Sequence, residues 1–321
     1  MSAEFQLLLQ VTLRFEMTHL PIQGLFAAVA TPVRDDGGFD AAAFDRLVDM
    51  LVEAGVDGIC IGGATGEYPH FESAARVSVI ERAAERLPPN KILLVGIGAA
   101  SLRKTLEVGK AALGVGSRAL LLPMPMFYRY QQDDLRAYAA TVSQELAAPC
   151  LLYDLPDFTN GIAPETALAL MRDEEFIIGI KDSSGRETNL ARFAAAREGL
   201  DWTLLVGDDR LLALGLQARW DGGISGLAGC CPELLVAIIR SARSGNHSET
   251  SRLLLLLDEL IAQIGGLPTP WGIRVALEGR GLATGTLPLP LSPSRRAQIE
   301  QVRTWFRNWH REQFGAASAR G

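Results

Sequence analysis

The sequence predicts an α/β protein, a (β/α)8 or TIM barrel with a C-terminal helical extension. Short runs rich in valine, isoleucine and leucine alternate with longer stretches of helical period. Eight such units follow one another without an intervening linker. Continuous apolar strands separated by helices are typical of a parallel sheet covered on its faces, and eight consecutive units fit a closed barrel better than an open sheet.

Helical patterns fill the gaps between the strands, and the clearest are DAAAFDRLVDMLVEAG (40–55) and DDLRAYAATVSQELA (133–147). The expected strands are 25–33, 58–63, 91–98, 118–125, 149–156, 176–184, 203–209 and 222–229.

We expect three segments along the chain: an N-terminal extension (1–19), the barrel (20–244) and a C-terminal helical region (245–321). The N-terminal extension does not resemble a signal peptide, because it lacks a basic start and polar residues interrupt its apolar stretch. Met17 is an alternative start. In the C-terminal region the helical patterns cover 247–264, 271–281 and 294–313, and the last residues, 315–321, are expected to be frayed.

Composition excludes several kinds of partner. The chain has 321 residues, a formal net charge of -6 and a pI near 5.4, so it offers no basic stripe for nucleic acid. No apolar run reaches the roughly 18 residues that span a bilayer, so no membrane association is expected. The cysteines show no metal-binding spacing, and their apolar neighbours predict buried, reduced thiols in a cytoplasmic protein; they are Cys60, Cys150, Cys230 and Cys231.

One lysine stands near the end of the apolar strand in EEFIIGIKDSSGRE (174–187). Only four of the 31 basic residues are lysine, so Lys181 looks selected for a property that arginine lacks, the ability to lose its proton. Reactive groups of such barrels lie where the strands end. Strand alternation sends Lys181 and Asp182 to opposite faces, and Gly179 is expected to leave space beneath the lysine.

Tyr153 falls on the inward face of the preceding strand, so it can meet Lys181 inside the barrel. A free lysine is neutral too rarely at pH 7 to be a good nucleophile, a handicap of roughly 4–5 kcal/mol that burial reduces. The neutral amine would attack a ketone to form an imine, and Tyr153 would shuttle protons. The alternatives are a lysine that reaches solvent or pairs with Asp208, and a tyrosine that only caps the core.

GGATGEYPHF (62–71) is the second conspicuous stretch. Its glycines and exposed amides suit an anion, the Thr65 hydroxyl would add a donor, and Glu67 is read as structural. The stretch is neither a P-loop nor a dinucleotide fingerprint. Asp208 and Asp209 are expected to cap the helix that starts at Arg210.

Taken together, the motifs resemble the N-acetylneuraminate lyase and dihydrodipicolinate synthase superfamily of class I Schiff-base aldolases. The resemblance extends from about Gly24 to Pro293. The motifs that carry it are GLFAAVATPVRDDGGFD, GGATGEYPHF, YDLPDFTNG, GIKDSSG, LLVGDD, GGISGLAGCCPEL and GLPTPWGIRVALEGRGLATGTLPLPLSP.

This resemblance implies that Lys181 forms an imine with a 2-oxo acid, usually pyruvate, and that Tyr153 shuttles protons. It implies that Thr65 and nearby amides, including that of Ala64, hold the carboxylate of the substrate. The remaining substrate-binding residues are then expected to be Ser225, Ile224 and Phe158. A homotetramer or homodimer is implied, with no metal or organic cofactor.

Three departures argue against dihydrodipicolinate synthase itself. Ala64 replaces a hydroxyl residue, Phe158 stands where the synthases carry an arginine, and Phe127 stands where they lend a tyrosine, unless Tyr128 or Tyr130 substitutes. Loss of the arginine contact would cost about 2–3 kcal/mol. We therefore favour a lyase or aldolase acting on a 2-oxo-3-deoxy sugar acid or a related 4-hydroxy-2-oxo acid. A hydratase-aldolase for aromatic substrates, a dehydratase, a synthase-like enzyme and a non-catalytic 2-oxo-acid-binding barrel are the alternatives.

Overall fold

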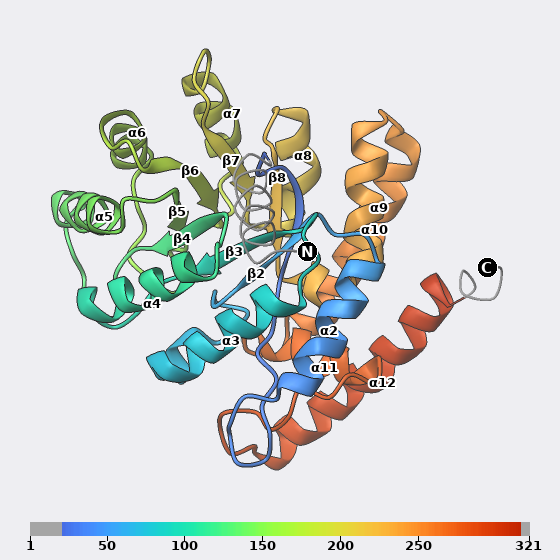
Figure 1. The fold of residues 1–321 in the computed structure, drawn as a ribbon. Helices are drawn as coiled ribbons and strands as arrows, with labels where there is room; N and C mark the ends of the chain where they lie inside the picture. The colour runs from blue at the N-terminus through green and yellow to red at the C-terminus, as the bar shows by residue number, and fades with distance from the viewer. Residues whose placement is uncertain (1–20, 316–321) are drawn as a thin grey trace, which may run out of the picture.

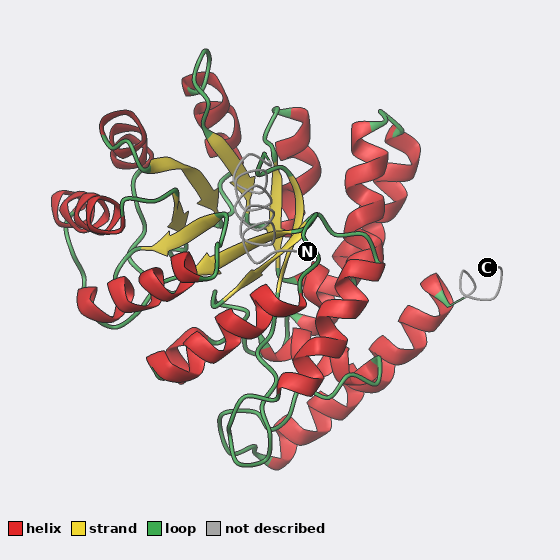
Figure 2. Ribbon diagram, in the orientation of Figure 1, coloured by secondary structure: helices red, strands yellow, loops and turns green. Residues whose placement is uncertain are grey.

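A computed structural model describes residues 21–315 of the chain. Eight parallel strands form a closed barrel in the order β1 to β8, so the predicted (β/α)8 barrel is confirmed. Figures 1 and 2 show the strands at the centre with helices around them. The strands are β1 (Gly24–Ala28), β2 (Gly58–Ile61), β3 (Ile92–Gly96), β4 (Ala119–Pro123), β5 (Cys150–Asp154), β6 (Ile177–Asp182), β7 (Thr203–Val206) and β8 (Gly222–Ser225).

Helices connect successive strands and surround the barrel, and three more follow it along one side (Figure 1). The surrounding helices are α2 (Ala41–Glu53), α3 (Ser73–Arg86), α4 (Leu102–Gly114), α5 (Gln132–Leu146), α6 (Pro164–Asp173), α7 (Glu187–Ala196), α8 (Leu212–Gln217) and α9 (Pro232–Arg243). The C-terminal helices are α10 (His247–Ile264), α11 (Trp271–Gly279) and α12 (Pro293–Phe314). Short 3-10 turns are η1 (Tyr68–His70), η2 (Asp209–Leu211) and η3 (Leu227–Gly229).

All eight strands lie where the sequence predicts them, but each ends two to five residues earlier than its apolar run. The first run extends to Val33, whereas β1 ends at Ala28, because the chain leaves the ladder there and forms a loop. The α10 bounds match the predicted helix, and α11 ends two residues earlier than predicted. The predicted N-terminal extension (1–19) and all but the first residue of the predicted frayed end (315–321) lie outside the described residues.

Side-chain alternation produces two apolar layers. Inward side chains such as Phe26, Leu94 and Leu151 fill the barrel, while outward ones such as Leu25, Val95 and Leu152 pack against the helices. Two separate layers of this kind are what closure of a parallel sheet requires.

Gly179 has a different purpose from the predicted one. A Cβ at Gly179 would lie 1.9 Å from the backbone oxygen of Thr203, so the glycine permits close approach of β6 and β7. This packing role differs from the space beneath Lys181 that the sequence suggested.

The C-terminal region is fastened to the barrel by a buried ion pair. Arg274 on α11 donates to Glu67 at 2.8 Å, and the side chains of both are at most 4% exposed. Arg274 also donates to the carbonyl oxygens of Thr284 and Thr286, at 2.7 and 2.8 Å. Glu67 thus has the structural role that the sequence suggested.

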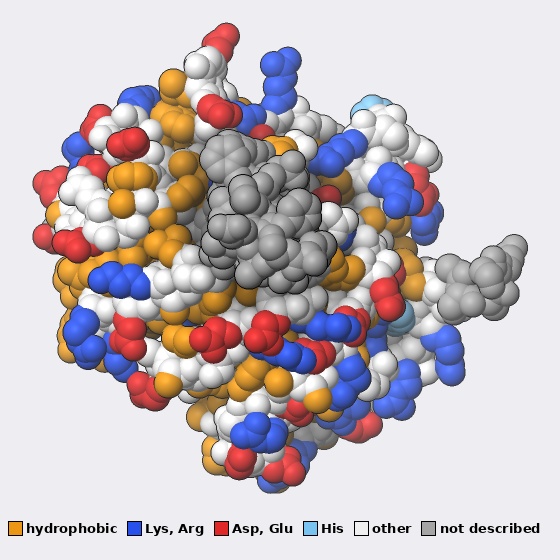
Figure 3. Space-filling model, in the orientation of Figure 1, with side chains coloured by type: hydrophobic (Ala, Val, Ile, Leu, Met, Phe, Trp, Pro, Cys, Tyr) orange, Lys and Arg blue, Asp and Glu red, His pale blue; other side chains and the backbone are white. Residues whose placement is uncertain are grey.

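The surface carries charges of both signs. Figure 3 shows Lys and Arg interspersed with Asp and Glu over the face it presents. Within residues 21–315, no helix has the length and apolar character needed to cross a membrane.

Candidate active site

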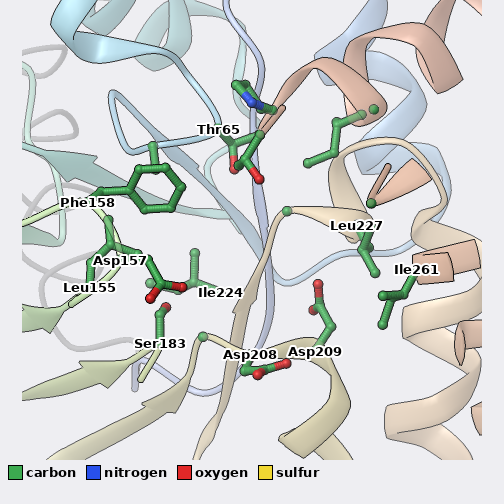
Figure 4. Close-up of a pocket in the computed structure, with 18 of the residues that line it drawn as sticks. Thr65, Leu155, Asp157, Phe158, Ser183, Asp208, Asp209, Ile224, Leu227 and Ile261 are labelled. Carbon is green, nitrogen blue, oxygen red and sulfur yellow. The ribbon is translucent and has the colours of Figure 1, made fainter. Parts of the chain in front are cut away.

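A cavity of about 350 Å³ opens at the carboxyl ends of the strands. The loops after β2, β5, β6, β7 and β8 contribute to its lining, as do α10 and α11. Figure 4 shows Thr65 and Phe158 on one side of this space and Asp208 and Asp209 on the other. A concave site at this rim is where (β/α)8 enzymes carry their reactive groups.

Lys181 and Tyr153 meet inside this cavity. They are register partners on the neighbouring strands β6 and β5, and the lysine Nζ lies 4.0 Å from the centroid of the tyrosine ring. Lys181 is 6% exposed and Tyr153 is 4% exposed. Because it is buried, Lys181 does not reach solvent. It forms no ion pair with any residue in 21–315, and Asp208 pairs with Arg210 instead.

The space beside the lysine is left by Gly207, in the loop after β7. A Cβ at this position would lie 2.8 Å from the Lys181 Cε and 1.9 Å from the Ser183 Oγ. Asp182 faces the opposite way, as alternation predicts: it accepts hydrogen bonds from the Asn189 side chain at 2.8 Å and from the Ser184 N–H at 2.7 Å.

Six of the seven predicted site residues line the cavity together. Thr65 is buried, whereas Phe158 is 53% exposed at the mouth. The seventh, Ser225, is fully buried behind the lining, where its Oγ accepts a hydrogen bond from the Ala228 N–H at 2.9 Å. The six are Lys181, Tyr153, Thr65, Ala64, Ile224 and Phe158.

Asp209 belongs to the cavity, although the sequence suggested only a helix cap. Asp208 is the residue that caps, since it accepts from the Arg210 N–H at 3.0 Å. Asp208 and Asp209 both line the cavity, and the Asp209 carboxylate is hydrogen-bonded by the Ser225 hydroxyl and the Leu227 N–H. Burial raises the pKa of Asp209 to about 6, and these two hydrogen bonds and the nearby Lys181 oppose the rise. Two adjacent aspartates give no sequence signal that shows which of them caps the helix.

The C-terminal region supplies an apolar wall that sequence reasoning also missed. Ile261 and Ile264 of α10 and Ile273 of α11 line the cavity. Helical periodicity indicates that these residues are on the buried faces of their helices, but it does not indicate what they face.

A second cavity, of about 840 Å³, lies beside the loop after β4 and is separate from the lysine. Phe127 and Tyr128 both line this second cavity, and their rings pack edge to face with 4.9 Å between centroids. Phe127 is the residue expected where the synthases supply a tyrosine to the partner subunit. Phe127 is 89% exposed and Tyr128 is 66% exposed. Asn160 donates to the Tyr128 carbonyl oxygen at 2.7 Å, so it ties this loop to the loop that carries Phe158.

Two aspartates sit side by side behind the catalytic candidates. Asp154 follows Tyr153, Asp182 follows Lys181, and the two aspartates are register partners. Asp154 is 2% exposed, and burial raises its pKa to about 6, helped by Asp182 and opposed by the Ile162 N–H. Because the folded-state pKa lies above the ordinary 3.8, the associated stability is complete below pH 3.8 and is lost as pH rises through 6.

Asp154→Asn is therefore expected to stabilise the protein at pH 8 by about 1–3 kcal/mol, because the neutral amide avoids a buried charge. The gain should shrink as pH falls towards 4. Urea unfolding of both proteins at pH 4.5 and pH 8 measures it. Asp201→Asn, at an exposed position, should change the free energy of unfolding by less than about 0.5 kcal/mol at either pH. A gain of equal size at both pH values would contradict the prediction.

A closed (β/α)8 barrel with a buried lysine at its carboxyl rim is the architecture of the class I Schiff-base lyases and aldolases. Residues 21–308 match the model of the dihydrodipicolinate synthetase family. The chain belongs to this family and is an enzyme of that class.

Several relatives share most of their length with the chain. A 4-hydroxy-tetrahydrodipicolinate synthase from Sorangium cellulosum is 32% identical over 292 residues, which cover 89% of this chain and 95% of the relative. The enzyme of the same name from Thermomicrobium roseum is 31% identical, covering 88% and 92%.

Solved structures show the same fold. YagE from E. coli K12, a protein of the dihydrodipicolinic acid synthase family solved in complex with pyruvate, has a TM-score of 0.82 and 26% identity, covering 90% of this chain and 98% of its own. The sialic acid aldolase of Ruminococcus gnavus has a TM-score of 0.81 at 19% identity, with coverage of 90% and 98%.

Proposed function

We propose that the protein is a pyruvate-type Schiff-base lyase in which Lys181 forms an imine with a 2-oxo acid and a carbon–carbon bond is cleaved or formed. The observation that carries the proposal is the position of the Lys181 Nζ, buried and 4.0 Å from the centroid of the Tyr153 ring in a cavity of about 350 Å³. The family relationship and the pyruvate bound to YagE support it.

In this mechanism the neutral amine attacks the ketone carbon, and loss of water gives the imine. Tyr153 takes the proton of the hydroxyl on C4, the C3–C4 bond breaks, and its electron pair moves towards the imine nitrogen. The aldehyde leaves and the enamine remains on Lys181. A proton then returns to C3, and water releases pyruvate and the free amine. Thr65 and the adjacent amides would hold the carboxylate next to the ketone.

The cavity mouth suggests the aldehyde partner. Asp157, Ser183 and Asp209 line the region around the lysine, and Figure 4 shows Asp157 and Ser183 pointing toward one another. Carboxylate and hydroxyl oxygens accept hydrogen bonds from the hydroxyls of a sugar chain, whereas the ring of Phe158 offers no donor to a second carboxylate. We therefore infer a 2-oxo-3-deoxy sugar acid, or a related 4-hydroxy-2-oxo acid, as the substrate.

A synthase reaction is the second candidate, because the curated relatives quoted above are named 4-hydroxy-tetrahydrodipicolinate synthase. In that case the carboxylate of an amino-aldehyde would need a cation at the mouth. The basic residues in the lining are Lys181 and Arg210, and the Arg210 side chain is 58% exposed and 4.0 Å from Asp208.

Borohydride reduction in the presence of pyruvate tests the proposed function. We expect one reduced pyruvyl adduct per chain, located on Lys181 by mass spectrometry of the peptide around it. An unmodified Lys181 would end the proposal. Incubation of the enzyme with hydroxylated sugar acids should release free pyruvate and an aldehyde; loss of water without pyruvate would favour a dehydratase instead.

The assembly is a further part of the proposal. We expect a homo-oligomer that buries the exposed rings of Phe127 and Tyr128, which form a large apolar surface beside the second cavity. Size-exclusion chromatography with light scattering gives the number of chains directly.

A further inference from the structure

Three potential metal ligands from distant parts of the sequence converge outside the lysine cavity. Cys231 and Glu233 lie at the start of α9, and His310 lies near the end of α12. One ligand atom from each, the Cys Sγ, a Glu carboxylate oxygen and a His ring nitrogen, lies within 4.8 Å of the other two. None of the three residues lines the cavity that contains Lys181.

A buried nitrogen of the His310 ring lies beside the Glu233 carboxylate. Its Nε2 is inaccessible to solvent and makes no hydrogen bond with the described residues. It lies 3.6 Å from a Glu233 oxygen, too far for a good hydrogen bond. The ring is held in place by stacking on Phe306, with 5.6 Å between centroids. The contact with Glu233 leaves this buried nitrogen without a hydrogen bond, and an ion bound between the two residues would satisfy both.

The other two ligands are also placed for a cation. Arg280 donates to both Glu233 oxygens, at 3.0 and 2.6 Å, and fixes the carboxylate while leaving each oxygen a second lone pair. A hydrogen-bonded ligand of this kind is typical of metal sites. Cys231 is fully buried, and burial raises the pKa of its thiol well above 9, so only a strong cation would hold it as a thiolate.

From this geometry we propose that Cys231, Glu233 and His310 bind a divalent cation of the zinc class and thereby fasten α12 to the start of α9. Sulfur, nitrogen and one carboxylate oxygen form a ligand set that Zn²⁺ accepts and that Mg²⁺ and Ca²⁺ do not prefer. In a tetrahedral zinc site the ligand atoms stand about 3.3–3.7 Å apart, so small side-chain rotations bring the three into range. The fourth position is left to water.

Sequence reasoning found no metal-binding spacing around the cysteines because the histidine comes from another helix, far along the chain. Because the three ligands join two helices and lie outside the lysine cavity, the proposed site has a structural role and is independent of the imine chemistry.

The test uses the untagged full-length chain, loaded with ZnCl₂ under reducing conditions and then exhaustively dialysed. We expect about one zinc per chain by elemental mass spectrometry. Cys231→Ala and His310→Phe should each retain less than about one tenth of that amount. Phenylalanine keeps the stacking on Phe306 and removes only the nitrogen. Cys230→Ala is the matched control, since Cys230 is adjacent and equally buried but outside the cluster.

Loading with CoCl₂ gives a second measurement that does not depend on metal content. A thiolate-to-cobalt charge-transfer band in the near ultraviolet is expected for the parent chain and for Cys230→Ala, and not for Cys231→Ala. Circular dichroism establishes whether each variant is folded. Zinc retained equally by all variants, no retained zinc in the parent chain, or a cobalt complex without the thiolate band would each overturn the proposal.

Discussion

Replacing Lys181 by methionine is expected to lower kcat/KM for cleavage of the 2-oxo acid by about 10⁴-fold or more, because the nucleophile that forms the imine is lost. Methionine has nearly the same length and no amine, so the packing against Tyr153 and Gly207 is retained. Steady-state assay of pyruvate release measures the loss, and borohydride trapping should give no adduct.

Two further variants test whether Lys181 acts as a nucleophile or only through its positive charge. Lys181→Arg keeps the positive charge but cannot form an imine, so it should be as inactive as Lys181→Met. Lys110→Met makes the same change at an exposed position on α4 and should leave activity within about two-fold of the parent. An arginine variant with substantial activity would show that Lys181 acts through charge alone.

Arg274→Met is expected to destabilise the protein by about 3–5 kcal/mol, because it leaves the buried Glu67 carboxylate without its cation. The arginine also satisfies the carbonyl oxygens of Thr284 and Thr286, which would lose their donor. Urea unfolding measures the loss of free energy. Because Glu67 follows Thr65 by two residues, the KM for the 2-oxo acid should rise as well.

A double-mutant cycle shows how much of that loss comes from the unpaired charge. Glu67→Gln combined with Arg274→Met removes both charges, so the double variant should be more stable than Arg274→Met alone. Arg252→Met breaks the exposed pair with Glu249 and should cost about 0.5 kcal/mol or less. If Arg274→Met costs no more than Arg252→Met, the buried pair does not fasten the C-terminal region.

The barrel could be predicted from the sequence because each strand is a continuous apolar run and each helix has a clear period. Strand ends could not be predicted, since the runs remain apolar beyond the last ladder hydrogen bond, as they do between Ala28 and Val33. Inside the barrel, alternation alone sufficed to bring Lys181 and Tyr153 together, because they lie on neighbouring strands at the same level.

Other parts of the site depend on contacts between elements, which the sequence does not specify. Asp208 and Asp209 are adjacent and chemically identical and both line the cavity, and only the turn of η2 makes Asp208 the helix cap. Gly179 and Gly207 are both near the lysine, but backbone packing decides which one makes room for it. The wall from α10 and α11 arises from docking of helices whose cavity-lining residues begin 80 positions beyond the lysine, at Ile261.

The cavity is built from two stretches of the chain, the barrel strands and the C-terminal helices that supply this wall. In the proposed reaction the imine depends on strand residues, whereas an apolar wall of the cavity comes from Ile261, Ile264 and Ile273. If the proposed reaction is right, substitutions in this second stretch are expected to change which aldehyde is accepted and to leave Lys181 and Tyr153 in place. Natural drift, or a laboratory library confined to these three positions, can therefore diversify substrates while the core chemistry is inherited unchanged.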